Sequence, residues 1–400
     1  MTATTFAPFS RAQLRHVDNS ALALARGDNG IPRPLFHAAE LAHAQEKIEA
    51  WSGYQPSTLR SLASLAAELD VGHILYKDEG ERFGLGSFKA LGGAYAVSEI
   101  ALNGADEIQQ ITVATATDGN HGLSVAWGAK NHSMQAVIYI HAEVSQGREQ
   151  ALLNLGAEVI RVEGNYDESV RICYAAAEKN DWHIISDTTS GDAGHDVARK
   201  VMTGYSVMVA EIVAQITDEL PTHVFVQGGV GGLAATVCEY FRIAYGDRAP
   251  KFIVVEPELA PCLYLSAEAE QATAVDVVEE TVMAGLSCGE VSSVAWPVLF
   301  HYTNDFLTIP DALVAPTMKI LANPFGGDDP IVAGESAVAG LAGFIAATQC
   351  DELKRTLNLK SDSRVLVIGT EGATDPALYQ SLTGLSAHAV RKTKADRDLS

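Results

Sequence analysis

Short β-branched runs alternate with longer stretches of helical spacing from about residue 50 onward. The strand-like runs lie at 73–77, 111–115, 135–141, 158–162, 183–186, 223–226, 252–256 and 364–368. The helix-like stretches between them include 92–103, 147–155, 167–180 and 231–244. Because strands that alternate with helices form βαβ units, this pattern predicts an α/β protein with parallel sheets. Residues 1–50 look irregular.

Length and charge limit the class of protein. A chain of 400 residues with 47% hydrophobic content is long enough for two domain-sized cores, or for one large core with an inserted lobe. The net charge of −22 argues against nucleic acid, because phosphate contacts need clustered Lys and Arg. It also disfavours an anionic membrane surface. We therefore expect a small-molecule partner, with no nucleic acid and no membrane.

The cysteines indicate a reducing compartment. They are Cys173, Cys238, Cys262, Cys288 and Cys350. An odd number without CxxC spacing fits buried thiols better than a disulfide framework, although the sequence leaves open whether Cys262 and Cys288 pair. No apolar run reaches membrane-spanning length, so we expect a cytoplasmic protein. We also expect no metal site.

Lys89 is the strongest candidate for covalent chemistry. It lies in KDEGERFGLGSFKALGGAYA, among small and apolar residues at a predicted helix start. Such surroundings disfavour the ammonium form, which suits an amine that condenses with a carbonyl cofactor. A surface lysine whose stem covers a helix is the alternative.

A glycine-rich turn, QGGVGG, follows a predicted strand and opens a predicted helix. Converging N–H groups at a helix start favour a phosphate there. Gly229, Gly231 and Ala234 also fit the dinucleotide fingerprint, with Glu256 about 20 residues on. The turn is thus compatible with a nicotinamide cofactor, with another phosphate-bearing cofactor, or with no ligand.

Two polar turns follow other predicted strands. In TDGNHG, the turn amides can hold a carboxylate and Asn120 offers a donor, but Asp118 or Asn120 acting as a helix cap explains the turn equally well. Asp187 ends another strand and enters a loop, where α/β proteins often bind ligands. An Asx turn is the alternative reading.

Taken together, these motifs resemble the fold-type II pyridoxal-phosphate (PLP) enzymes, and most of all the diaminopropionate ammonia-lyase family. The segments that carry the resemblance are QPSTLRSL, KDEGERFGLGSFKALGGAYA, ATDGNHG, GAEVIRVEGNYDESV, QGGVGGLA, MAGLSCGEVS, ANPFGGDDPIVAGESAVAGLAG and IGTEGATDP. The combination of FGLGSFK with TDGNHG is fairly specific, since related dehydratases generally have Ser-x-Gly-Asn-His at the second motif.

The resemblance implies roles for particular residues. Lys89 would form an imine with PLP, Asn120 would meet the phenolic oxygen, and Thr370, or less well Thr374, would meet the pyridine nitrogen. The implied phosphate cradle consists of Gly228, Gly229, Val230, Gly231 and Gly232. Asp118 and Asp187 occupy the positions of the catalytic carboxylates, with Lys89 and Asp118 as bases for opposite enantiomers. The turn residues Thr117, Gly119 and His121 would bind the substrate.

The implied architecture is two parallel-type open sheets flanked by helices. A large cofactor domain would comprise 1–90 and 200–400, and a smaller α/β domain, 91–200, would be inserted, with the cofactor in the cleft between them. A homodimer is also implied. Two departures stand out: the loop after Asp187 lacks the family's aromatic residues, and Gly369 stands where a serine is common.

The implied reaction is β-elimination of ammonia from D- or L-2,3-diaminopropionate, giving pyruvate and ammonia. Three alternatives stay open from the residues. The altered loop after Asp187 favours a PLP-dependent dehydratase of serine, threonine or another β-hydroxy amino acid. The glycine fingerprint is compatible with a nicotinamide oxidoreductase, and a non-catalytic sensor of amino acids or PLP is the third.

Overall fold

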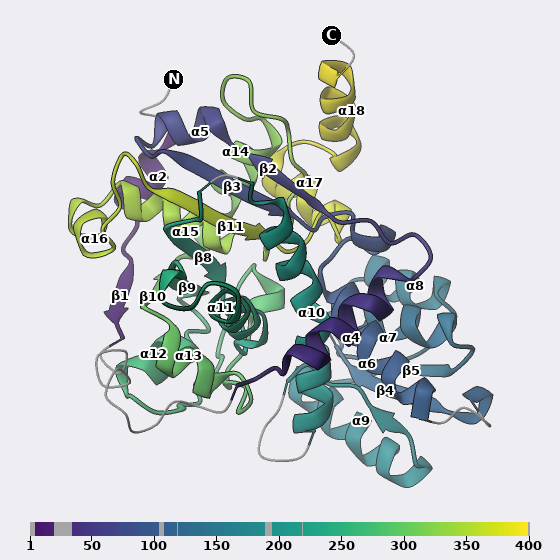
Figure 1. The fold of residues 1–400 in the computed structure, drawn as a ribbon. Helices are drawn as coiled ribbons and strands as arrows, with labels where there is room; N and C mark the ends of the chain where they lie inside the picture. Colours follow the sequence, from purple (N-terminus) through teal and green to yellow (C-terminus); the bar gives the residue numbers. More distant parts are fainter. Residues whose placement is uncertain are drawn as a thin grey trace. The chain divides into compact units, whose positions relative to one another are not determined.

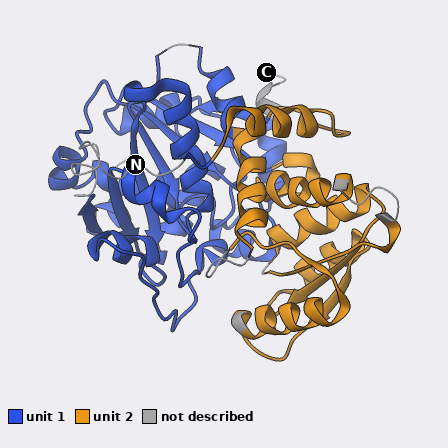
Figure 2. Ribbon diagram, turned by 60° about the horizontal axis from the view of Figure 1, so that its bottom comes forward, with its two compact units in different colours: residues 1–35, 57–80, 209–400 blue, residues 36–56, 81–208 orange. Residues whose placement is uncertain are grey.

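The computed structural model describes residues 5–19, 34–103, 108–117, 119–188, 194–217 and 219–398. They divide into two compact units, shown in different colours in Figure 2. Unit 1 comprises residues 1–35, 57–80 and 209–400, and unit 2 comprises residues 36–56 and 81–208. The predicted inserted domain, 91–200, lies within unit 2, which also includes 36–56, 81–90 and 201–208.

Unit 1 contains a seven-stranded sheet with the order β1-β10-β9-β8-β11-β3-β2 (Figure 1). Its strands are β1 (Arg15–Asp18), β2 (Thr58–Ser61), β3 (His73–Asp78), β8 (His223–Gln227), β9 (Lys251–Pro257), β10 (Asp305–Ile309) and β11 (Arg364–Gly369). The five central strands are parallel, whereas the edge strands β1 and β2 pair antiparallel with their neighbours. The α/β prediction is confirmed, with these two antiparallel edges as the difference.

Helices and short 3₁₀ turns complete unit 1. They are α2 (Ala7–Arg11), α5 (Ala63–Glu68), α11 (Gly232–Tyr245), η3 (Gly246–Arg248), α12 (Cys262–Glu268), η4 (Ala284–Leu286), α13 (Trp296–Tyr302), η5 (Asp311–Leu313), α14 (Val314–Ala322), α15 (Ala339–Thr348), α16 (Asp351–Thr356), α17 (Pro376–Thr383) and α18 (Ala387–Asp398).

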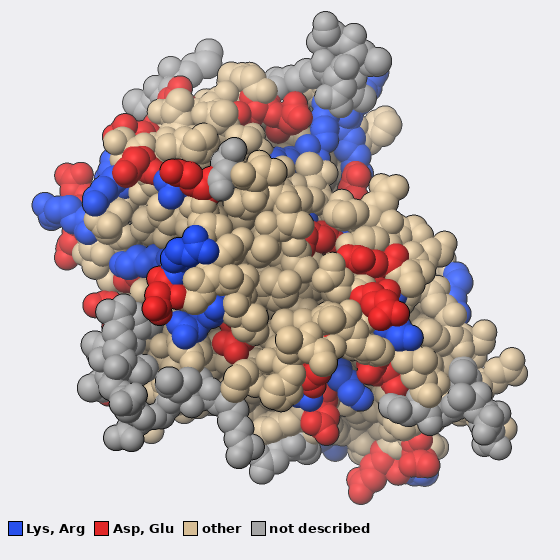
Figure 3. Space-filling view, viewed as in Figure 1, with Lys and Arg blue, Asp and Glu red and all other residues tan. Residues whose placement is uncertain are grey.

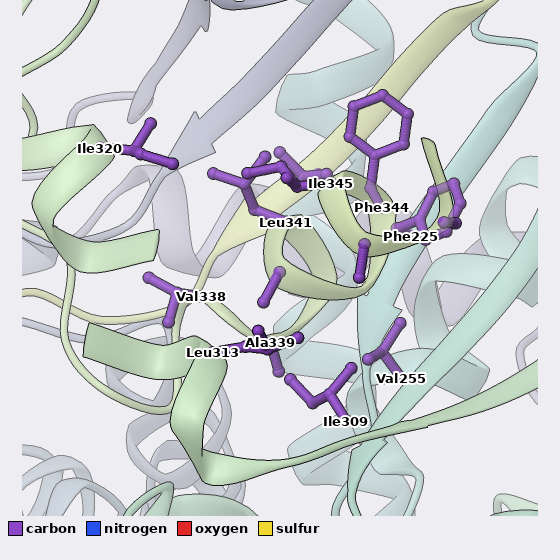
Figure 4. Packing of buried hydrophobic residues seen from close by; sticks show 14 of the residues in the cluster. Phe225, Val255, Ile309, Leu313, Ile320, Val338, Ala339, Leu341, Phe344 and Ile345 are labelled. Atoms are coloured by element: carbon purple, nitrogen blue, oxygen red, sulfur yellow. The ribbon is translucent and has the colours of Figure 1, made fainter. Parts of the chain in front are cut away.

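The core of unit 1 is built around α15. This helix reads AGLAGFIAAT, apolar on all sides, and nine of its ten residues are buried. A helix without a polar face is stable only when it is surrounded by apolar groups. Figure 4 shows α15 among the strands' apolar side chains, with the Phe344 ring 5.3 Å from that of Phe225 on β8. The central strands are buried along their length, as expected for parallel strands.

Unit 2 contains a four-stranded parallel sheet with the order β6-β5-β4-β7. Its strands are β4 (Thr112–Ala116), β5 (Gln135–Ile140), β6 (Glu158–Arg161) and β7 (His183–Ile184). Its helices are α4 (Ala38–Glu49), α6 (Lys89–Asn103), α7 (Asn120–Asn131), α8 (Gln146–Asn154) and α9 (Tyr166–Asn180), with η1 (Arg82–Gly84) and η2 (Ile108–Gln110). Helix α10 (His195–Gln215) begins in unit 2, and its last residues belong to unit 1.

Helix α4 corrects the expectation that residues 1–50 are irregular. It begins with a capping box in which the His37 N–H donates to Glu40 Oε2, 2.9 Å away. His43 contacts Glu99 of α6 (3.1 Å), and Arg199 of α10 pairs with Glu40 (2.8 Å). These polar contacts explain why 36–56 belongs to unit 2.

Charged side chains of both signs lie on the face of the molecule that Figure 3 shows. On the face shown in Figure 3, Asp and Glu are interspersed with Lys and Arg. Among the described residues, no helix is long and apolar enough to cross a membrane.

Candidate active site

Lys89 is the first residue of α6, as the sequence predicts for a helix start. The Ser87 Oγ accepts from the Lys89 N–H at 3.2 Å, so a local hydroxyl holds the helix start. The Lys89 Nζ donates to Asp187 Oδ2. The lysine side chain is 25% exposed and that of Asp187 is 14% exposed. The predicted apolar surroundings are therefore incomplete, because a carboxylate lies directly beside the amine.

His121 lies beside the same carboxylate. Its ring is buried, its Nε2 is 2.9 Å from the Ile185 carbonyl, and its Nδ1 is 3.8 Å from Asp187 Oδ2. A carbonyl only accepts, so Nε2 carries the hydrogen and Nδ1 keeps its lone pair when the ring is neutral. Nδ1 has no hydrogen-bond partner among the described residues. Burial lowers the pKa of His121; Asp187 opposes this shift and Lys89 adds to it.

Asp187 is an anion at neutral pH. Burial acts to raise its pKa, but His121 and Lys89 together outweigh burial and hold the pKa below the ordinary carboxyl range. Asp187 therefore stays ionised and can hold, through a hydrogen bond, a proton that stays on a neighbour; it is poorly suited to taking up a proton or supplying one. The structure brings Lys89, His121 and Asp187 together. The sequence named all three as candidate site residues but did not predict these contacts.

The turn before α7 is organised by Thr117. This buried residue uses its Oγ1 to accept from the N–H groups of Gly119 (3.0 Å) and Gly122 (3.3 Å). Gly119 is the N-cap of α7, with φ 154° and no side-chain cap, and Asn120 is the first helical residue. Asn120 is therefore not the cap of this helix. Asp118 lies outside the described residues.

Tyr205 of α10 is a residue that the sequence reasoning missed. Its ring packs against Phe88, with the ring centroids 4.6 Å apart. Its buried hydroxyl has no partner in the described part of the chain. Burial raises the pKa of Tyr205, so the hydroxyl is neutral and can donate. No spacing rule marks an aromatic residue in the apolar stretch VMTGYSVMV, so no sequence signal identifies it.

In unit 1, the predicted cradle Gly228–Gly232 forms the turn between β8 and α11. Gly231 has φ +100°, and a Cβ there would lie 2.8 Å from Leu299, so two constraints demand glycine. Two backbone hydrogen bonds join the turn to neighbouring segments: the Gly228 N–H donates to Val255 O at 2.9 Å, and Val230 O accepts from the Ser292 N–H at 2.8 Å.

The remaining N–H groups of this turn suit an anion. Within the described residues, no hydrogen bond is made by the N–H groups of Gly229, Val230 and Gly231. They precede the N-terminus of α11, a helix of 14 residues that adds positive potential. A phosphate fits this donor set.

Glu256 rules out the nicotinamide alternative. The residue is fully buried, and its two carboxyl oxygens accept from the N–H groups of Leu263 (2.8 Å) and Tyr264 (2.6 Å). Burial raises its pKa to about 8. A carboxyl group occupied in this way does not present itself to a ribose.

Cys262 and Cys288 are not paired in a disulfide in the structure. Cys262 Sγ donates to Gly229 O at 3.5 Å, and burial raises the pKa of this thiol well above its usual value. Cys262 thus contributes a packing contact behind the glycine turn.

Thr370 follows β11 directly and is buried. Its Oγ1 accepts from Gln227 Nε2 at 2.9 Å. The Thr374 Oγ1, the weaker candidate, is buried without a partner among the described residues. Gly369 precedes Thr370, and a Cβ at Gly369 would lie 1.9 Å from the Tyr76 hydroxyl. The bulk of Tyr76 therefore explains why serine is absent here.

The residues fit PLP on these observations: an amine beside a carboxylate, open N–H groups at a helix start, and a buried hydroxyl after a strand end. Comparisons agree. The profile of the family described as pyridoxal-phosphate dependent enzyme matches residues 50–371.

Two curated relatives and one solved structure are similar over nearly their whole length. Diaminopropionate ammonia-lyase of Escherichia coli (strain K12) is 37% identical, covering 90% of this chain and 96% of the relative. Diaminopropionate ammonia-lyase of Salmonella typhimurium (strain LT2) is 33% identical, covering 94% and 96%. The crystal structure of the Escherichia coli enzyme in complex with an aminoacrylate-PLP azomethine reaction intermediate matches with a TM-score of 0.85 and 36% identity, covering 95% of this chain and 99% of that one.

We predict that His121 makes the folded state sensitive to acid. Its pKa is lower in the folded than in the unfolded chain, so the unfolded state binds more protons below about pH 6.5. Replacing it (His121→Gln) should reduce the loss of unfolding free energy between pH 7 and 5 by up to about 2 kcal/mol, as measured by urea unfolding at each pH.

His183→Gln, at an exposed histidine of the same unit, is the control and should follow the wild type. An identical pH response in His121→Gln and wild type would contradict a buried, neutral His121.

Proposed function

The chain belongs to the diaminopropionate ammonia-lyase family of pyridoxal-phosphate-dependent enzymes, and we propose how its own residues divide the elimination of ammonia among them. The enzyme is a PLP-dependent lyase that converts 2,3-diaminopropionate to pyruvate and ammonia. The observation that carries the proposed division of roles is the contact of Lys89 Nζ with Asp187, beside the buried His121.

Each contact with PLP that the resemblance implies is assigned here to a residue of the chain. We assign Lys89 to the attachment of the cofactor through its amine, and Asn120 to the phenolic oxygen. The open N–H groups of Gly229, Val230 and Gly231 support the assignment of the turn Gly228–Gly232 to the phosphate. Thr370 is assigned to the pyridine nitrogen. When bound, PLP supplies an electron-withdrawing ring that makes the Cα–H bond of an amino acid acidic.

Lys89 and Asp118 are the proposed bases. The Lys89 amine takes the Cα proton from one enantiomer, and the Asp118 carboxylate takes it from the opposite face of the other. Thr117 holds the turn that flanks Asp118 through the N–H groups of Gly119 and Gly122. The substrate-binding role expected of Thr117 is therefore proposed as indirect, while Gly119 and His121 stay candidates for direct contact.

Asp187 acts on the leaving group by holding a proton in place. An amine leaves readily only when protonated, and an adjacent carboxylate favours the ammonium form of any amine beside it. Asp187 already pairs with one ammonium, that of Lys89. A substrate with a second ammonium suits this anion, whereas the neutral hydroxyl of serine does not.

Two further assignments rest on the resemblance and on the composition of the chain. We propose a homodimer, as the resemblance implies, and a cytoplasmic location, which the five free cysteines support.

The function is tested by a visible absorption spectrum of the purified protein before and after adding D- or L-diaminopropionate, with pyruvate measured afterwards. Lys89→Ala should abolish both the absorption of attached PLP and pyruvate formation, because it removes the attachment point. Lys130→Ala, at an exposed lysine of α7, should behave as wild type. Normal turnover in Lys89→Ala would remove the lysine from the mechanism.

Asp118→Asn should distinguish the two faces of the substrate. We expect kcat/KM for D-diaminopropionate to fall by about 10²–10⁴, the usual contribution of a general base, with a smaller loss for the L-enantiomer. Steady-state pyruvate formation from each enantiomer measures both values. Equal losses would contradict the assignment of separate bases.

Asp187→Asn should weaken the preference for a leaving ammonium. The kcat/KM for diaminopropionate should fall by about 10²–10³, and the ratio of this value to that for serine should fall as well. Asp181→Asn makes the same chemical change at an exposed residue and serves as the control. If diaminopropionate and serine lose activity equally, Asp187 does not select the leaving group.

A further inference from the structure

Gln227 is the last residue of β8, and its side chain is buried. Its Nε2 lies within hydrogen-bond distance of three oxygens: Thr370 Oγ1 (2.9 Å), the Ile368 carbonyl (2.9 Å) and the Ala337 carbonyl (3.3 Å). Strands β8 and β11 are parallel neighbours, so this amide joins the carboxyl ends of two strands.

The orientation of the amide is fixed by its neighbours. Two of the three oxygens are backbone carbonyls, which only accept, so the amide nitrogen and not the oxygen must face them. The Gln227 Oε1 is buried on the other side and has no partner among the described residues. An amide oxygen left in this way destabilises the fold, and an apolar side chain would avoid the penalty. We therefore infer that a glutamine stands at position 227 for the hydrogen bonds that its Nε2 donates, and not for its oxygen.

The consequence falls on Thr370. A hydroxyl has one hydrogen and two lone pairs, and one lone pair here receives the Gln227 N–H. The Thr370 hydrogen must therefore point away from Gln227. In the structure as described, no protein group accepts the Thr370 hydroxyl hydrogen, so it is available to an acceptor that the chain does not supply.

We propose that Gln227 is a positioning residue that fixes the Thr370 hydroxyl as a hydrogen-bond donor to the pyridine nitrogen of PLP, so that this nitrogen stays unprotonated. The inference rests on the proposed role of Thr370 and extends it to a second residue. A pyridine nitrogen that accepts a neutral hydrogen bond withdraws electrons less strongly than a pyridinium. Negative charge then stays nearer the substrate's Cα, next to the leaving ammonium.

Gln227 also precedes the phosphate turn directly. The same side chain that orients Thr370 therefore stands at the start of Gly228–Gly232, and it ties that start to β11 through the Ile368 carbonyl. Gln227 thus links Thr370 to the turn Gly228–Gly232, the two proposed cofactor contacts of unit 1.

The first test uses the wild-type holoenzyme loaded with PLP labelled with ¹⁵N in the ring. We expect the ¹⁵N resonance of a pyridine nitrogen that accepts a hydrogen bond and carries no proton. A pyridinium resonance would overturn the inference without any variant having to fold.

The second test compares Gln227→Met and Thr370→Val, singly and combined, with Gln349→Met and Thr374→Val as controls that should leave the resonance unchanged. Gln349 likewise donates its amide to a threonine hydroxyl, that of Thr348, at 3.2 Å. Each single change should shift the ¹⁵N resonance towards that of a pyridine without a donor and raise the apparent Kd for PLP by about three- to tenfold, the effect of one hydrogen bond. The double variant should show no further shift, because both act through one contact.

The outcomes separate the two levels of the proposal. If Thr370→Val shifts the resonance and Gln227→Met does not, the positioning role is wrong and the role of Thr370 stands. If only Thr374→Val shifts it, the assignment of Thr370 is wrong and the inference falls, while attachment at Lys89 is unaffected. Should Gln227→Met fail to fold, Gln227→Asn withdraws the amide by one methylene and should produce the same shift; an unchanged resonance there would contradict the inference.

Discussion

The contact between the Lys89 amine and the Asp187 carboxylate is the interaction on which the remaining chemistry depends. Both side chains are mostly withdrawn from water, where opposite charges interact more strongly than on an open surface. His121 closes the group with a buried ring whose orientation is fixed by the Ile185 carbonyl. Three elements supply these groups: the start of α6, the first turn of α7 and the segment after β7. The Lys89 amine is thus held beside the Asp187 carboxylate, which stays ionised at neutral pH.

Much of the fold could be predicted from the sequence, because buried parallel strands consist of runs rich in β-branched residues. All eight predicted strands correspond to strands of the structure. The three that were missed, β1, β2 and β10, include the edge strands RHVD and TLRS, whose exposed polar positions break the apolar signal. Helix α4 was missed because it is stabilised by contacts with Glu99 and Arg199, more than 50 residues away in sequence.

The site was predictable where a local motif carries the chemistry. Lys89 at a helix start and the glycine turn follow from neighbouring residues. The position of Gln227 beside Thr370 and that of Tyr205 beside Phe88 do not, because each contact joins segments that are distant in sequence: Thr370 follows another strand, and Phe88 precedes α6 whereas Tyr205 lies on α10. The same limit applied to the glycine fingerprint, whose ambiguity ended only when Glu256 proved to be occupied by the amides of α12.

The most direct test of the account is to reduce the PLP-loaded enzyme with borohydride and map the labelled peptide. Borohydride converts the bond between a lysine amine and PLP into a stable amine, which marks the residue. The account predicts a single labelled peptide containing FGLGSFK, with the label on Lys89. A label on any other lysine, or no label on a protein that has bound PLP, would contradict it.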